Sequence, residues 1–327
     1  MNTVRLAVIG CGLLLAMPVP ASAQALDYPN RAVTFVVPFA PGGSTSIIAR
    51  ILSQKLEQRL GKPFVVENRP GSGGMIAVSQ VAHGTPDGYT IMMASSTALA
   101  INVNVRKQLP YDPRHDITPI ALVARMPYVL VVNPELPVQS VDDLVRLAKQ
   151  KPGQLSFASV GPGTIHHLNA ELFKSSFGLD IVHVPYKGTA PALQDVVGGH
   201  VQFMFSDVPP TRALIASGRL RALGVTTAQR VPALAGVAPL AEVGIPGFDT
   251  ASWHSISVAA GVPKPIVDRL ANEIRAVMSD PEVQKMLSDE GAIPQVSPSP
   301  EEFKRFVDAE IVRWGELVAK AGILHSQ

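Results

Sequence analysis

Short apolar runs recur along this chain, and most are followed by a turn rich in Gly or Pro and then by an amphipathic segment. The run Val33–Val37 predicts a buried strand. Apolar residues then recur at helical spacing from Ile47 to Leu60, and Gly61 ends the pattern. Repetition of this unit predicts parallel strands joined by right-handed helical crossovers, and therefore an α/β fold. The next strands expected are Phe64–Val66, Tyr89–Met93, Leu155–Ser159, Ile181–Val184, Val201–Phe205 and Trp253–Ala259.

The middle of the chain predicts a division into two lobes. Ile120–Val123 and Tyr128–Val132 are expected as two strands, separated at Arg125-Met126-Pro127. Chain crossings near Ala121–Arg125 and Leu223–Thr226 would make the second lobe an insertion in the first, joined by a two-crossing hinge. We expect a first lobe of residues 24–123 and 225–327, which includes C-terminal helices, and a second lobe of residues 124–224.

Two glycine corners resemble each other. In Val33–Ser46 and in Leu155–Thr164, an apolar strand leads through a Gly/Pro turn to hydroxyl residues that open a helix. Such a corner directs free backbone N–H groups and the positive end of a helix dipole at one point, which favours an anion. Two of them facing each other across a cleft predict a site for a small carboxylate.

The first lobe supplies one wall of the predicted site. Gly42 and Gly43 allow a close approach of backbone, although a Gly-Gly pair by itself only indicates a turn between a strand and a helix. Hydroxyls that end the Tyr89–Met93 strand either face the same space or cap a helix. The residues predicted here are Phe39, Ala40, Gly42, Gly43, Ser95 and Thr97.

The second lobe supplies the facing wall. Thr164 either caps its helix or donates to the ligand. Lys187 either pairs with a distal carboxylate of the ligand or is solvated. Asp207 either accepts from the ligand or stabilises the turn that follows it. His166 and His167 are adjacent, so they do not form a metal pair. Either one of them lines the cleft or, as expected for each, it is a packing or surface histidine. The residues predicted here are Gly161, Gly163, Thr164, Lys187, Gly188, Thr189 and Asp207; no metal or cofactor is expected.

Composition and the N-terminus restrict the class of protein. The 327 residues carry 28 basic and 26 acidic side chains without a basic stripe, which disfavours nucleic-acid binding. Residues 1–23 read as a signal peptide, with Arg5, the apolar run Leu6–Ala16 and the cleavage site Ala21-Ser22-Ala23. Cys11, the only cysteine, would be removed with it, so we expect an exported periplasmic monomer without disulfides.

An ordered series of motifs resembles the Bug-type extracytoplasmic solute receptors of tripartite tricarboxylate transporters. The series runs through Tyr28-Pro29, Val37–Gly43, Glu67–Gly74, Pro86–Thr90, Pro162–Thr164, Val184–Gly188, Gly218–Leu223 and Pro263-Lys264-Pro265. The resemblance implies a type II periplasmic-binding-protein fold, no catalysis, and delivery of a small organic acid to inner-membrane permease subunits. One departure stands out: the family often has an acidic residue three positions after its first Gly-Gly pair, where this chain has Ser46.

Two other functions share parts of this pattern. A sensory co-receptor for a membrane kinase would have the same fold and pocket. An α/β hydrolase is disfavoured, because the chain lacks G-x-S-x-G, H-E-x-x-H, Walker A and G-x-G-x-x-G motifs, although a Ser–His–Asp set drawn from distant positions would leave no such motif.

Overall fold

The computed structural model describes residues 27–326 of the chain, so the signal peptide predicted at 1–23 lies outside the described residues. Strands and helices alternate through most of this range, as the sequence predicts. The strands are β1 (Val33–Val37), β2 (Phe64–Asn68), β3 (Thr90–Ser95), β4 (Ile117–Val132), β5 (Ser156–Ser159), β6 (Val182–Pro185), β7 (Phe203–Asp207), β8 (Arg221–Val225), β9 (Ala251–Ala259) and β10 (Ile293–Pro294).

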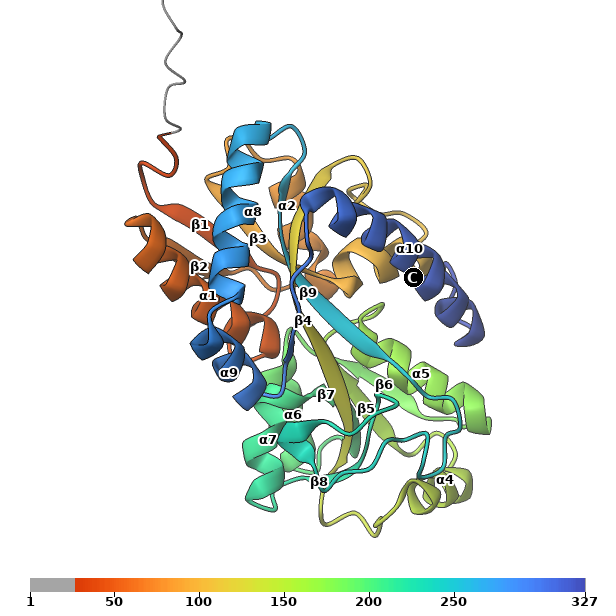
Figure 1. Ribbon diagram of the computed structural model, residues 1–327. Coiled ribbons are helices and arrows are strands. Elements are labelled where there is room, and N and C mark those ends of the chain that lie inside the picture. Colours follow the sequence, from red (N-terminus) through yellow and green to blue (C-terminus); the bar gives the residue numbers. More distant parts are fainter. Residues whose placement is uncertain (1–26, 327) are drawn as a thin grey trace, which may run out of the picture.

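Helices cover the sheet in both halves of the molecule (Figure 1). They are α1 (Ser44–Leu60), α2 (Met75–Ala82), α3 (Asn102–Val105), α4 (Val141–Gln150), α5 (Ile165–Phe177), α6 (Thr189–Val197), α7 (Val208–Ala216), α8 (Lys264–Met278), α9 (Pro281–Asp289) and α10 (Pro300–Lys320).

The strands form one curled sheet in the order β2-β1-β3-β9-β4-β7-β5-β6, with β8 and β10 also paired to β4. Pairs within β1–β3 and within β5–β7 are parallel, whereas β4 is antiparallel to all its neighbours. Figure 1 shows β4 and β9 in the middle of the molecule. We call the part around β1, β2, β3 and β9 the first lobe and the part around β5–β8 the second lobe.

The expectation of two separate strands around Arg125-Met126-Pro127 is wrong, because β4 is one continuous strand. Its residues Ile117 to Pro127 pair with β9, and from Tyr128 onward it pairs with β7. Pro127 has no N–H to donate, and it lies where β4 changes from one partner strand to the other, so the loss of one ladder bond is tolerated there. One strand therefore spans both lobes.

The position of the other crossing, predicted near residues 223–226, stays a prediction. Residues after β8 stay on the second lobe, where Pro239 pairs with Val225 and Phe248 stacks on Phe205 of β7. β9 then enters the first lobe. The boundary at residue 225 stays a prediction, and this packing favours a later one.

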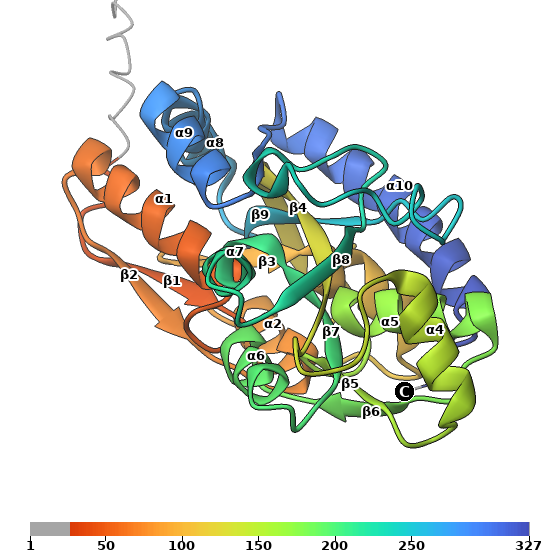
Figure 2. The same ribbon diagram turned by 90° about the horizontal axis from the view of Figure 1, so that it is seen from below.

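Helix α1 illustrates how the sequence sets the elements that bear the site. It begins after Gly43, whose backbone is extended, and it ends at Gly61, whose left-handed φ of 68° lets its N–H bond back to the carbonyl of Glu57. Ile48, Leu52 and Leu56 are buried against the sheet. Figure 2 shows α8 and α9 near the far end of α1, which leaves its N-terminus directed toward the second lobe.

Candidate functional site

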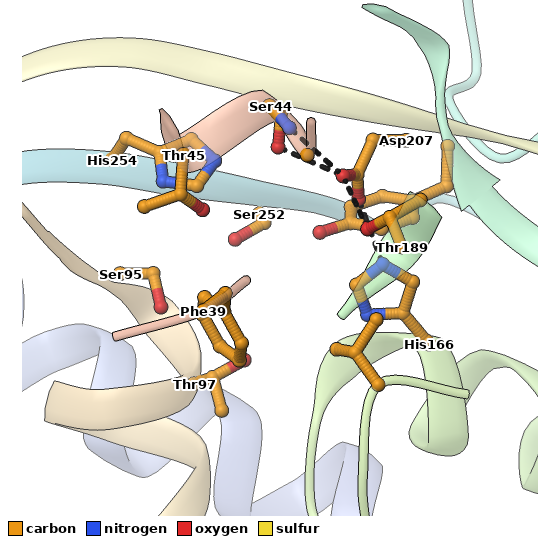
Figure 3. A pocket seen from close by; sticks show the side chains of 13 residues that line it. Phe39, Ser44, Thr45, Ser95, Thr97, His166, Thr189, Asp207, Ser252 and His254 are labelled. Atoms are coloured by element: carbon orange, nitrogen blue, oxygen red, sulfur yellow. Dashed lines mark hydrogen bonds and ion pairs between the residues drawn. The ribbon is translucent and has the colours of Figure 1, made fainter. Parts of the chain in front are cut away.

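A small cavity lies between the lobes, beyond the carboxyl ends of β1, β3 and β7. Its volume is about 20 Å³, which is room for one water-sized group. The lining combines hydroxyls, two imidazoles and one carboxylate with two aromatic rings (Figure 3). The lining residues are Phe39, Gly43, Ser44, Thr45, Ser95, Thr97, Tyr128, Val160, His166, Thr189, Asp207, Ser252 and His254.

Asp207 joins the two lobes across this cavity. It occupies the N-cap position of α7, but its side chain makes no capping bond there. Its Oδ2 instead accepts from the Ser44 backbone N–H at 3.3 Å and the Ser44 hydroxyl at 2.9 Å, both at the start of α1 in the first lobe. Within the second lobe, Oδ2 also accepts from the Thr189 hydroxyl at 3.1 Å, and Oδ1 lies 2.7 Å from Nε2 of His166 (Figure 3).

These contacts keep the Asp207 carboxyl ionised. Burial alone raises its pKa, but the charge of His166 and hydrogen bonds from His166 and Ser44 outweigh burial, so the pKa lies below its usual value. Since a carboxylate only accepts, His166 donates through Nε2–H. The edge of the Tyr128 ring system lies against His166, with ring centroids 5.0 Å apart.

His254 lies across the cavity from Asp207 (Figure 3). It is 2 % exposed, and neither of its ring nitrogens has a hydrogen-bond partner within residues 27–326. Burial lowers its pKa to about 4, although the Asp207 charge acts in the opposite direction. At neutral pH His254 is therefore uncharged, and it offers one N–H donor and one acceptor to whatever enters the cavity. Nδ1 of His166 is likewise buried and unpartnered in the described chain.

The structure brings six of the thirteen sequence-predicted site residues to the cavity: Phe39, Gly43, Ser95, Thr97, Thr189 and Asp207. Each of the six follows or ends a strand, or opens the helix after it.

Seven predicted residues do not line the cavity. Several form direct contacts between the lobes: a Cβ added to Gly188 would lie 2.8 Å from Cβ of Ala40, and one added to Gly42 would lie 3.2 Å from Cβ of Ala190. The Lys187 side chain is exposed, and its carbonyl accepts from the Ala40 N–H at 3.4 Å. The seven are Ala40, Gly42, Gly161, Gly163, Thr164, Lys187 and Gly188.

The second glycine corner directs its amides inward. The N–H of Gly161 donates to the Ser159 hydroxyl at 3.0 Å, and the N–H of Gly163 donates to Nδ1 of His167 at 3.3 Å. The Thr164 hydroxyl donates to the Gly161 carbonyl at 2.7 Å. These groups are satisfied within their own loop, so this corner presents glycine surface to the first lobe rather than free donors.

Seven lining residues are not among those predicted from the sequence: Ser44, Thr45, Tyr128, Val160, His166, Ser252 and His254. Ser252 and His254 alternate on one face of β9, and polar residues with a period of two on a buried strand are a signal that could have found them. His167 is a packing histidine, as expected, and stacks on His183 at 4.3 Å. Ser46 is buried and accepts from the Asn68 amide at 3.3 Å, away from the lining.

Residues 27–326 contain neither a metal-binding cluster nor a membrane-spanning helix. No group of three or more His, Cys, Asp or Glu side chains there could hold a metal ion. Over the same residues, no helix combines the length and the apolar character needed to cross a bilayer.

Comparison with known proteins identifies the family. Residues 48–323 match the model of the tripartite tricarboxylate transporter family receptor. The chain belongs to this receptor family. Protein BugT of Bordetella pertussis is 36 % identical over 325 residues, which cover 98 % of this chain and 99 % of BugT. The resemblance inferred from the sequence motifs is thereby confirmed.

Solved structures agree with this assignment. Rpa4515 of R. palustris with adipate superposes with a TM-score of 0.88 at 40 % identity, covering 91 % of this receptor and 99 % of that chain. MatC from Rhodopseudomonas palustris with bound malate gives 0.85 at 31 % identity, covering 89 % and 100 %. The expected α/β binding-protein fold is confirmed, and so is the expectation of a solute receptor rather than an enzyme.

Proposed function

We propose that this receptor is exported to the periplasm after cleavage of residues 1–23, captures a small organic carboxylate between its lobes, and delivers it to the membrane subunits of a tripartite tricarboxylate-type permease. The observation that carries the proposal is the interlobe cavity, where the unpartnered nitrogens of His254 are buried. Buried polar groups in folded proteins are normally satisfied, so a ligand is the natural partner for these atoms.

The chemistry of the lining favours an acid. Ser95 and Thr97 line the cavity with hydroxyls beside His254, and all of these groups are neutral donors. Several neutral donors in a buried site can hold a carboxylate without fixing the rest of the ligand. The relatives solved with adipate and malate bind small organic acids at the same fold, which supports this class of ligand for the present chain.

A thermal-shift screen of organic acids tests the binding function. A ligand that binds only the folded state stabilises it by about 2.7 kcal/mol at a concentration a hundred times its Kd. At least one acid is expected to raise the Tm of the mature protein and to be recovered unchanged by mass spectrometry after hours of incubation. If no acid of a broad screen raises the Tm, the proposal fails.

Transport is tested in the cell. Deletion of the receptor should abolish uptake of the acid found in the screen, and restoring the gene should restore uptake. Retained uptake together with loss of gene induction by that acid would instead indicate a sensory co-receptor.

A further inference from the structure

The carboxylate of Asp207 occupies the anion position at the N-terminus of α1. This helix has 17 residues and no acidic residue of its own in the first turn, so its dipole and its free N–H groups favour a negative group from elsewhere. Asp207 provides that group: its Oδ2 takes the Ser44 N–H, the Ser44 hydroxyl and the Thr189 hydroxyl. The carboxyl side chain is 4 % exposed.

This arrangement leaves the Asp207 end of the cavity with few free donors. The three groups that would hold a ligand carboxylate there are already bonded to Asp207. A second carboxylate at the same place would lie against a buried like charge. Nδ1 of His166 is also buried at this end and has no partner within the described chain.

The opposite end of the cavity has free donors. His254 lies there with the hydroxyls of Thr45 and Ser95, on the other side of the cavity from Asp207 and Thr189 (Figure 3). The nearby Ser252 hydroxyl is bonded to that of Ser96 at 2.7 Å. The imidazole of His254 is 2 % exposed and has no partner on either nitrogen within the described chain. The cavity itself has room for only a water-sized group, so a ligand requires the lobes to part. Between the parted lobes, the His254 side is suited to a carboxylate and the Asp207 side to a group that donates.

We propose that Asp207 determines specificity by occupying the α1 anion position, so that the receptor selects acids with a single carboxylate and a hydroxyl or ammonium at the far end, and rejects diacids. This inference rests on the proposed function and names the class of ligand within it. Malate and adipate, the molecules bound in the two solved relatives, are both diacids. The proposed preference would therefore differ from the ligands seen in those relatives.

The test compares matched acids by isothermal titration calorimetry. Succinate, butyrate, 4-hydroxybutyrate and 4-aminobutyrate form one set, and adipate, hexanoate, 6-hydroxyhexanoate and 6-aminohexanoate form another. Wild type should bind the hydroxy or amino acid of one set at least tenfold more tightly than the diacid of that set. Asp207→Ala frees the Ser44 and Thr189 donors, so its affinity for the diacid should rise at least tenfold relative to the hydroxy and amino acids.

Two further variants distinguish the charge of the Asp207 side chain from the volume it fills, and both from the loss of any carboxylate in this lobe. Asp207→Asn keeps the shape of the side chain but removes its charge, so it should gain affinity for the diacid to a smaller extent than Asp207→Ala. Asp195→Asn removes a carboxylate of the same lobe that bonds Tyr186 outside the cavity lining, and its ligand preference should equal that of wild type. If Asp207→Ala does not melt cooperatively, Asp207→Asn decides the test.

The inference is overturned if wild type prefers the diacid of a set, or if neither Asp207 variant changes the preference. It is also overturned if no variant binds any of the eight acids, because the freed donors should accept a carboxylate. Gain of diacid binding in Asp207→Ala supports it even where wild type binds none of the eight. A wild-type receptor that binds diacids best would contradict this inference while supporting the proposed function, so the two failures are distinguishable.

Discussion

At the scale of single residues, His254 is a buried imidazole whose ring nitrogens have no partner within the described chain. It is surrounded by the lining of the cavity, and the charged groups that influence it are Asp207 and His166 of the second lobe. Burial lowers the pKa of His254 to about 4, from an ordinary value of 6.5. In the unfolded chain the same ring titrates near its ordinary value, so folding and protonation of His254 oppose each other.

This opposition predicts how stability depends on pH. Between pH 6.5 and 4 the unfolded chain binds a proton at His254 that the folded chain does not, so the free energy of unfolding should fall as the pH falls through this window. The contribution is at most about 3 kcal/mol. His254→Gln should reduce this slope in urea titrations from pH 7.5 to 4, whereas His200→Gln, which changes an exposed ring, should not. Equal slopes in wild type and His254→Gln would contradict the assignment.

The residues of the site could be predicted from the sequence only where they directly follow a strand. Asp207 and Ser95 follow predicted strands, and Gly43 precedes a predicted helix, so local pattern places them at one edge of the sheet. Tyr128 and His254 lie within long strands, and whether they face the cavity depends on how β4 and β9 cross between the lobes. The bond between Ser44 and Asp207 joins residues 163 positions apart, and no local pattern reports it.

At the scale of elements, α10 is attached to the first lobe by a buried carboxylate. Glu310 accepts from the indole N–H of Trp253 on β9 and from that of Trp314 on α10, each at 2.8 Å. The rest of the helix follows the sequence prediction: Ser299 caps its N-terminus, and Phe303 and Val318 are buried on its apolar face. Glu310 lies on the buried face although a carboxylate is the least expected residue there, because two indole donors and the Arg313 guanidinium at 3.2 Å satisfy it.

Glu310→Ala should therefore destabilise the protein more than the loss of one surface acid would. Both indole donors would lose their partner inside the protein, and each unsatisfied buried donor costs about 1–3 kcal/mol. Glu310→Gln retains an accepting oxygen and should lose only part of this stability. Thermal and urea unfolding of the two variants measure the difference, with Glu316→Ala on the same helix as the control. Equal stability of Glu310→Ala and Glu316→Ala would show that the indole bonds contribute nothing.

At the scale of the whole molecule, the glycine corners bring the two lobes into contact. A Cβ added to Gly161 would lie 3.2 Å from the backbone nitrogen of Gly73, and Arg106 donates to the Pro162 carbonyl at 2.7 Å. The sequence predicts two corners in separate lobes and assigns their role to free amides. The small size of the glycines matters here as much as their amides do, because only residues without a Cβ allow backbones of different lobes to approach this closely.

Gly43 offers a direct test of lobe contact, since its φ of −91° is accessible to any residue and a substitution there adds no backbone strain. A Cβ at this position would lie 3.3 Å from the Thr189 hydroxyl oxygen and 3.9 Å from Oδ2 of Asp207. Gly43→Val should therefore hold the lobes apart, which increases the radius of gyration measured by small-angle X-ray scattering and weakens acid binding at least tenfold. The matched control is Gly236→Val, because a Cβ at Gly236 meets no atom within 4 Å. Cooperative melting of both variants, with only Gly43→Val more open and weaker in binding, is the expected outcome. Wild-type affinity in Gly43→Val would mean that closure at this corner does not form the binding site.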